Sequence, residues 1–195
     1  MKVCLDAGHS QARDTGGDPG AVNGDYWESI AALSIVKKLA NMFSNAGVQV
    51  LLTRSGGKPN LTLKERCRIA NDNDVDCFIS VHLNSADNKS ASGIETLRYP
   101  SCGYVTKKLA DSVQDHLVEV MKWKNRGVKE RGNLYVLKNT KMPAVLAEVG
   151  FISNDEQCKE LFEDYNQFKI AQAIFLATMK VFEAKYESTR VNRLS

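Results

Sequence analysis

Apolar residues recur along this chain with two different spacings, one typical of strands and the other of helices. Short apolar runs predict strands at residues 2–7, 48–53 and 76–83. Apolar residues at every third or fourth position predict helices at residues 28–45, 62–73 and 104–122. The helix at 62–73 begins with Thr62 and Glu65, which form a capping-box pattern. This alternation of strands and helices indicates an α/β fold with a largely parallel sheet.

The rest of the chain continues the same pattern. Residues 94–99 alternate between apolar and polar positions and predict an edge strand, and residues 134–137 and 144–149 predict two short strands. Helical spacing returns at residues 157–163 and 168–186. The polar residues 187–195 predict a tail or the start of a linker, so the expected domain spans residues 1–186.

A polar, Gly-rich stretch at residues 8–27 separates the first strand from the first helix. Connections of this length without predicted structure are uncommon in a compact domain and are usually functional. We therefore expect functional residues on either side of this stretch.

Length, charge and cysteine content narrow the class of protein. A chain of 195 residues suits one α/β domain with a sizeable core. The formal net charge of +3, without runs of Lys or Arg, gives no argument for a nucleic-acid partner. The five cysteines are odd in number and form no CxxC pair, so neither a disulfide framework nor a cysteine metal site is expected. The sequence shows no apolar signal-peptide core and no stretch long enough for a membrane span.

Four side chains with metal-binding or acid–base chemistry occupy comparable places in the predicted fold. His9 follows the first strand, His82 ends the strand at 76–83, and Glu148 lies near the end of the strand at 144–149. Glu28 begins the first helix. Because the carboxyl ends of parallel strands share one edge of a sheet, where α/β proteins bind ligands, these side chains are expected to converge.

Imidazole and carboxylate groups are ligands of catalytic zinc, which keeps three protein ligands and a water molecule. A further carboxylate can take the proton of that water and pass it to a leaving group. The residue pattern leaves simpler interpretations open. A strand-end histidine is often an ordinary polar residue, a glutamate at a helix start is favoured by the helix dipole, and an exposed strand end is a simpler explanation for Glu148.

The chain resembles the zinc-dependent N-acetylmuramoyl-L-alanine amidases of the type-3 amidase family, which includes bacterial autolysins and phage endolysins. The matching segments cover nearly the whole chain in the family's order: LDAGHS at 5–10, Glu28 in the following helix, SVHLNS at 80–85, GIETLRY at 93–99 and LYVLKNTKMPAVLAEVGFISN at 134–154. Each segment is short, but the ordered set is specific.

The resemblance implies a single zinc amidase catalytic domain built on a twisted, mostly parallel six-stranded sheet with helices on both faces. It implies that His9, Glu28 and His82 bind one Zn²⁺ and that Glu148 is the catalytic glutamate. The implied substrate is peptidoglycan, cut at the amide between N-acetylmuramic acid and the L-alanine of the stem peptide. Three further residues are candidates for substrate contacts or for support of the metal site: Asn84, Glu95 and Arg131.

Some features depart from the secreted members of the family. The sequence shows neither a signal peptide nor a cell-wall-binding repeat, which favours a phage or prophage lysin, or its catalytic domain. We therefore expect synthesis in the cytoplasm and action on the cell wall after release or lysis. A wall-binding module could follow this domain on its C-terminal side. The short segment before Glu28 predicts an open groove. The alternative functions are a zinc peptidase that cuts within the stem peptide or cross-bridge, and an inactive wall-binding module.

Overall fold

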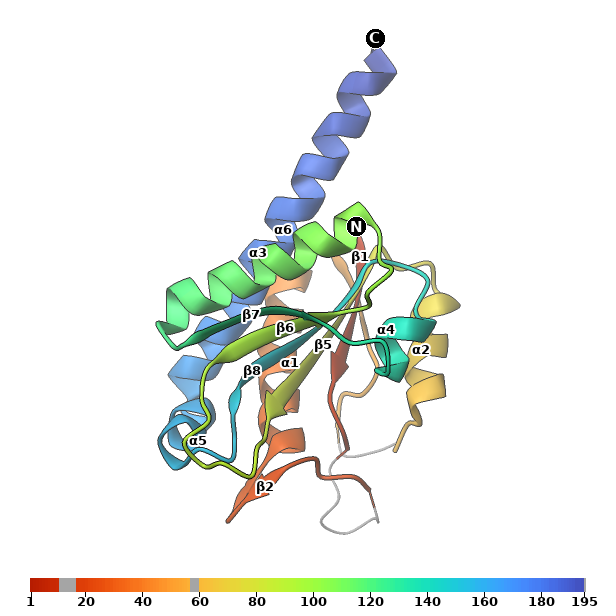
Figure 1. The fold of residues 1–195 in the computed structure, drawn as a ribbon. Coiled ribbons are helices and arrows are strands. Elements are labelled where there is room, and N and C mark those ends of the chain that lie inside the picture. Colours follow the sequence, from red (N-terminus) through yellow and green to blue (C-terminus); the bar gives the residue numbers. More distant parts are fainter. Residues whose placement is uncertain (11–16, 57–59, 195) are drawn as a thin grey trace.

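The computed structural model describes residues 1–10, 17–56 and 60–194, with side chains through residue 183. Residues 11–16 of the predicted Gly-rich connection therefore lie outside the described residues. Six strands form one twisted sheet (Figure 1), in the spatial order β4 (Gln49–Leu52), β1 (Lys2–Ala7), β5 (Cys77–Asn84), β8 (Ala144–Phe151), β6 (Ile94–Arg98) and β7 (Asn125–Glu130). Neighbouring strands are parallel except for β6 and β8, which are antiparallel.

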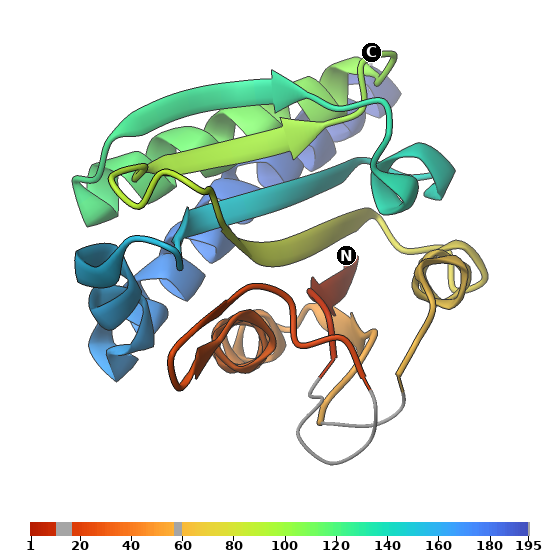
Figure 2. The ribbon, with the colours of Figure 1, turned by 60° about the horizontal axis from the view of Figure 1, so that its bottom comes forward.

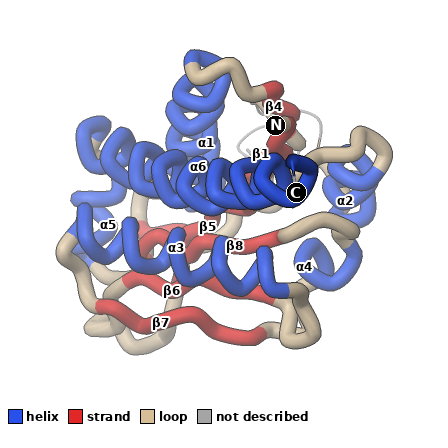
Figure 3. Tube along the Cα trace, turned by 90° about the horizontal axis from the view of Figure 1, so that it is seen from above, coloured by secondary structure: helices blue, strands red, loops and turns tan. Residues whose placement is uncertain are grey.

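Helices cover both faces of this sheet. One face carries α1 (Glu28–Asn45), α3 (Tyr104–Met121) and α6 (Asp164–Leu194), and the other carries α2 (Leu63–Asn71) and α4 (Tyr135–Asn139). In Figure 3, α6 lies between α1 and α3, and it packs against both. The predicted α/β domain, with a mostly parallel six-stranded sheet and helices on both faces, is confirmed.

The alternation of side chains along each strand explains the two hydrophobic cores. In β1, Val3 and Leu5 face α1 and the larger core, whereas Cys4 points to the opposite face and joins the smaller core under α2 and α4. Successive side chains of a strand point to opposite faces, so a strand that is buried on both faces is apolar at nearly every position. Both faces of the central strands are therefore closed except near the strand ends.

Local sequence signals account for several helix ends. Thr62 and Glu65 form the predicted capping box, since Thr62 Oγ1 accepts from the Glu65 amide at 3.3 Å and Glu65 Oε2 accepts from the Thr62 amide at 2.8 Å. Gly47, with φ of 75°, follows the last residues of α1. Asn154 caps α5 (Asp155–Phe162) by accepting from the Gln157 amide. None of the helices in the described part of the chain is long and apolar enough to cross a membrane.

Several elements differ from the prediction. Residues 94–99 were expected at an edge, but β6 lies inside the sheet between β8 and β7. The strand predicted at residues 134–137 is instead the short helix α4, and β7 was not predicted at all. The final helix α6 was predicted to end at Tyr186, but it continues to Leu194. The connection between β1 and α1 ends in a small hairpin formed by β2 (Val22–Asn23) and β3 (Tyr26–Trp27).

Candidate metal centre and active site

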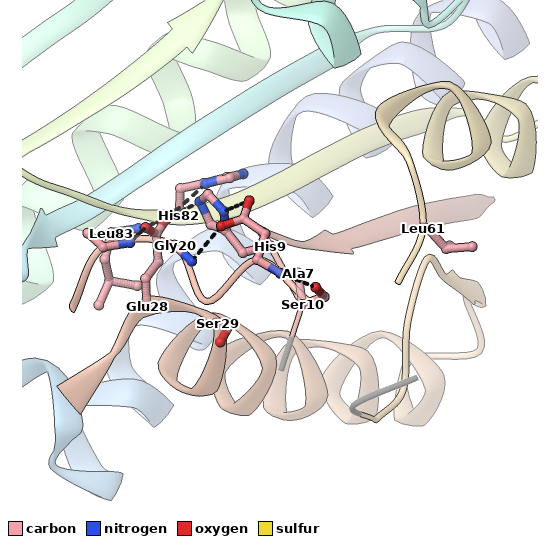
Figure 4. Close-up of polar contacts among 12 residues, drawn as sticks. Ala7, His9, Ser10, Gly20, Glu28, Ser29, Leu61, His82 and Leu83 are labelled. Carbon is pink, nitrogen blue, oxygen red and sulfur yellow. Dashed lines mark hydrogen bonds and ion pairs between the residues drawn. The ribbon is translucent and has the colours of Figure 1, made fainter. Parts of the chain in front are cut away.

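Three side chains meet at the carboxyl-terminal edge of the central strands. His9 follows β1, His82 lies near the end of β5, and Glu28 is the first residue of α1. Glu28 Oε1 lies 3.2 Å from His9 Nε2 and 2.9 Å from His82 Nδ1, and the three potential ligand atoms all lie within 4.8 Å of one another. Figure 4 shows these side chains converging from their three elements. The structure thus brings together the three residues that the sequence proposed as metal ligands.

Two buried arginines hold the backbone that leads to His9. Arg54 donates to the carbonyl oxygens of Ala7 and Gly8, at 3.0 and 2.8 Å. Arg66 donates to the carbonyl oxygens of Ala7 and His9, at 2.8 and 2.5 Å. His9 has a φ of 60°, a left-handed conformation that costs energy for a residue with a Cβ. The arginine contacts stabilise this turn, which directs the His9 ring away from the sheet toward Glu28.

Asp6 provides the counter-charge beneath this turn. It is 1% exposed, and its carboxylate accepts from Arg66 at 2.7 Å, from Thr53 Oγ1 at 2.6 Å and from Ser80 Oγ at 2.6 Å. Burial alone would raise the pKa of Asp6, but the charge of Arg66 and the two hydroxyl hydrogen bonds hold it below its ordinary value. Asp6 is therefore a charged group at neutral pH and fixes Arg66 in position.

Asp18 holds the His9 ring from the side opposite Glu28. Its Oδ2 lies 2.7 Å from His9 Nδ1, and its Oδ1 accepts from the Gly20 amide at 2.9 Å. The Ser10 amide also donates to the Asp18 carbonyl, at 2.7 Å. A carboxylate on one ring nitrogen fixes the tautomer and orientation that a metal-ligating histidine needs at the other nitrogen. Asp18 was not among the predicted site residues, because it is one of several polar residues in the Gly-rich stretch.

Two glycines make room for the converging side chains. A Cβ on Gly8 would lie 2.5 to 2.7 Å from three atoms of the His82 ring. Gly20 has a φ of 71°, and a Cβ there would lie 2.6 Å from both Glu28 Oε2 and His9 Cδ2. Only glycine leaves the space that these rings and the carboxylate occupy.

Glu28 is almost fully buried and is tied to the protein through both carboxylate oxygens. Its Oε1 accepts from the Leu83 amide at 3.0 Å, and its Oε2 accepts from the Ala21 amide at 2.9 Å. Burial would raise the pKa of Glu28, but hydrogen bonds and charge from His82 and His9 hold it well below its usual range. Burial would lower the pKa of His9, but Glu28 and Asp18 raise it to about 9. The pKa of His82 is raised in the same way, mainly by Glu28 against the effect of burial.

The cluster therefore stabilises positive charge between two imidazoles and one carboxylate. This donor set suits a catalytic metal ion with three protein ligands. The ring planes make an angle of 75°, and both His9 Nε2 and His82 Nδ1 lie within 3.2 Å of the same oxygen, Glu28 Oε1. The residues present thus fit a metal site.

Glu148 lies beside this cluster on the neighbouring strand. It pairs in register with His82 on one side and with Glu95 on the other. Its Oε2 is buried, without a hydrogen-bond partner among the described residues. Burial raises the pKa of Glu148 to about 7, with Glu28 and Glu95 adding to the rise and His82 opposing it. A carboxyl group with a pKa near neutrality can both accept and release a proton.

The structure brings two of the three remaining candidate residues to the same place. Asn84 Nδ2 donates to Glu95 Oε1 at 3.1 Å, and Glu95 is 6% exposed. Arg126, which was not among the predicted site residues, donates from Nε to Glu95 Oε2 at 2.9 Å. Arg131 is not part of this group, because it follows the far end of β7 and donates to the Glu130 carbonyl at 3.3 Å.

Comparison with known proteins identifies the family. A family model described as N-acetylmuramoyl-L-alanine amidase matches residues 3–180. The chain belongs to the N-acetylmuramoyl-L-alanine amidase family. The match extends over β1 through most of α6, so it includes every residue of the amidase site described above.

Individual relatives of this amidase agree with the family match. The uncharacterized protein YqiI of Bacillus subtilis (strain 168) is 36% identical over 173 residues, which cover 88% of this chain and 80% of YqiI. The endolysin of Bacillus phage SPP1 is 37% identical over 83% of this chain but only 59% of its own length. The crystal structure of the N-acetylmuramoyl-L-alanine amidase from Clostridium difficile 630 has a TM-score of 0.87 and 31% identity, covering 94% of this chain and 97% of that one.

Proposed function

We propose that this amidase hydrolyses the amide bond between N-acetylmuramic acid and the L-alanine of the stem peptide in peptidoglycan, with one zinc ion held by His9, Glu28 and His82. The observation that carries the proposal is the position of Glu148, whose Oε2 has no hydrogen-bond partner among the described residues, directly beside a cluster of three side chains that could hold a metal ion. The family match supports the choice of bond.

Each residue of the site has a defined task in this reaction. A bound zinc ion would supply Lewis acidity toward water and the scissile carbonyl. Glu148 takes a proton from the attacking water as the carbon–oxygen bond forms, and it returns that proton to the alanine nitrogen as the carbon–nitrogen bond breaks. Its pKa of about 7 suits both transfers at neutral pH. Asp18 and the amides of Ala21 and Leu83 keep the ligand side chains in their orientation.

Asn84 and Glu95 are proposed to form the floor of the groove next to Glu148. Their hydrogen bond joins β5 to β6 across the end of β8, and the negative charge of Glu95 helps to raise the pKa of Glu148. Arg131 stays a prediction from the sequence alone, and its position beyond the far end of β7 does not support a contact with the reacting group.

The variant Glu148→Gln tests the role of the glutamate. Glutamine keeps the shape of the side chain but cannot accept the proton, so kcat on purified peptidoglycan should fall by roughly 10²- to 10⁴-fold. Zinc content, measured by elemental analysis of the purified variant, should stay at the wild-type level because Glu148 is not one of the three proposed ligands. Near-normal lysis by this variant would overturn the assignment.

Product analysis separates the proposal from its alternatives. An amidase releases intact stem peptides with a free L-alanine amine and leaves unsubstituted glycan chains, whereas a zinc peptidase produces peptide fragments with an internal cut. Mass spectrometry of the digest distinguishes these products. A non-catalytic wall-binding module would give no loss of turbidity in a cell-wall suspension, with or without a chelator.

The place of action follows from the substrate. We propose that the protein acts on the bacterial cell wall after release or lysis, as a lysin would, and that a wall-binding module joined to this domain would raise its local concentration on that polymer. The partial coverage of the phage SPP1 endolysin supports the idea that a catalytic domain of this kind works within longer proteins.

A further inference from the structure

Four polar side chains form a row across neighbouring strands, beginning at the metal centre. His82 on β5 pairs with Glu148 on β8, which pairs with Glu95 on β6. Arg126 on β7 joins the row through its ion pair with Glu95 at 2.9 Å. Side chains of paired residues point to the same face of a sheet, so the row lies on one surface that leads away from the metal centre.

This surface is the open end of the face that carries α2 and α4. Figure 2 shows those two helices at one end of the strands, with the carboxyl ends of β5 and β8 and the amino ends of β6 and β7 at the other. The two helices cover the apolar side chains of the smaller core, such as Phe78 and Leu146. The polar row lies beyond that core on the same strands.

A bulge in β7 directs Arg126 toward the row. The pairing of β6 with β7 shifts between Ile94 and Thr96, so that β7 carries an extra residue opposite Glu95. Gly127 in this bulge has a φ of 78°, which favours glycine. Irregularities of this kind often redirect a side chain next to a functional site.

The guanidinium of Arg126 is held by two contacts, but these contacts involve only some of its hydrogen-bond donors. Its Nε donates to Glu95 Oε2, and its Cζ lies 4.8 Å from the centre of the Phe151 ring. Within the described part of the chain, Arg126 donates a hydrogen bond through Nε alone, and its side chain is 32% exposed. Its two terminal amino groups are therefore available to a ligand on this surface.

We propose that Arg126 binds a carboxylate on the second or third residue of the stem peptide, and so determines which peptidoglycan the enzyme prefers. This inference rests on the proposed function. Arginine suits a carboxylate because its planar fork donates two parallel hydrogen bonds. Glu95 would repel a substrate carboxylate, and Arg126, which lies beside it at the end of the row, is the cation that offsets this repulsion.

The distances agree with this assignment. Adjacent strands are about 4.8 Å apart, so the backbone of Arg126 lies about 14 Å from that of His82 across three strand spacings. The Arg126 side chain extends from β7 toward Glu95 on the adjacent strand β6, which brings its guanidinium closer to the metal centre than its backbone is. An extended peptide advances about 3.5 Å per residue, so the second and third stem residues lie about 7 to 10 Å from the scissile bond.

Soluble muramoyl tripeptides that differ in one carboxylate test the inference. One pair carries either a free carboxylate or its amide on the second residue, and another carries a third residue with or without a side-chain carboxylate. The zinc-loaded full chain should cleave the acid of at least one pair with a kcat/KM roughly tenfold or more above that of its neutral counterpart. Arg126→Gln should reduce this ratio to about twofold or less, and Arg126→Lys, which keeps the charge but loses the fork, should give an intermediate ratio.

Lys129→Gln is the matched control, because Lys129 is a cation further along the same strand and pairs with Leu97. It should leave the ratio unchanged. A wild-type enzyme without discrimination in either pair would overturn the inference, as would an Arg126→Gln variant that keeps the ratio. Loss of the ratio in Arg131→Gln with Arg126→Gln unaffected would overturn it as well. An equal fall in kcat on both members of a pair would show that Arg126 only supports Glu95.

Binding of the free tripeptides, measured by calorimetry, separates this inference from the proposed function. If the wild type cleaves no muramoyl peptide, the proposed function fails. In that case a tighter Kd for the acid than for the amide, abolished in Arg126→Gln, would still support the carboxylate site, and equal Kd values in the wild type would overturn it.

Discussion

His9 reaches the metal centre only because its ring is held on both sides. Asp18 Oδ2 contacts Nδ1 at 2.7 Å while Glu28 faces Nε2. In Asp18→Ala no carboxylate holds the His9 ring in one tautomer and one orientation. The affinity for zinc should therefore fall by roughly 10- to 100-fold. Competition against a chromogenic chelator measures this affinity.

The control for this residue is Asp111→Ala. Asp111 is an exposed aspartate on α3, so its removal should leave the zinc affinity unchanged. If Asp18→Ala binds zinc as tightly as the wild type does, the contact with His9 has no part in holding the ligand.

The residues of the site were predictable to different degrees. His9, His82 and Glu148 follow or lie near the predicted ends of their strands, and this placement alone predicted that they converge at one edge of the sheet. Glu28 gained its role from the family resemblance, since a glutamate at a helix start has a simpler explanation in the helix dipole.

Two other contacts depend on geometry that local sequence does not reveal. Asp18 acts through the folding of a polar stretch back onto His9. Arg126 acts through a bulge in a strand that was not predicted. Arg131 has the chemical type that suits a substrate carboxylate, but it follows the distant end of that strand, and no local pattern in the sequence reveals this position.

At the scale of elements, the buried pair of Asp6 and Arg66 joins β1 to α2. Replacing Asp6 by Asn leaves the Arg66 guanidinium buried without its counter-charge, so the free energy of unfolding should fall by about 3 kcal/mol at pH 7. Urea denaturation measures this change. A difference near zero would mean that hydrogen bonds to carbonyl groups suffice to hold Arg66.

The same pair predicts how stability depends on pH. The pKa of Asp6 is lowered in the folded protein, so its contribution is complete above the unfolded value of about 4 and is lost as pH falls below that value toward the folded pKa. The difference in unfolding free energy between the wild type and Asp6→Asn should therefore shrink between about pH 4 and lower pH. A difference that grew on acidification would contradict this assignment of charge.

Elements with strong periodicity were predicted well, and short ones were not. The helices α1 and α3 follow their apolar spacing, and Thr62 marked the start of α2. The run Leu134–Leu137 has residues that favour strands, but a short apolar run does not distinguish a strand from a buried helical turn. β7, with the sequence NRGVKE, lies at the edge of the sheet and needs few apolar side chains, so it has no alternating pattern to detect.

At the scale of the whole molecule, the sheet order explains how distant segments build one site. The strands β1, β5 and β8 are neighbours in the centre of the sheet, although long helices separate them in sequence. Reversal of β6 and β7 then places their amino ends beside the carboxyl ends of those central strands. Both the metal centre and the row that leads to Arg126 are consequences of this order.

Truncation of the chain tests the predicted domain boundary at residue 186. In the described part of α6, residues that face the core continue as far as Phe182, which is 1% exposed. A chain of residues 1–186 retains all of them, so its melting temperature should lie within a few degrees of the full chain's, with unchanged zinc affinity. A chain of residues 1–181 loses the Phe182 side chain and should be less stable by about 3 to 5 kcal/mol.

Calorimetry on both chains, with Phe182→Ala in the full chain as the matched variant, measures the two effects. If residues 1–186 are destabilised as much as residues 1–181, the helix beyond Tyr186 belongs to the folded domain and the predicted boundary is wrong.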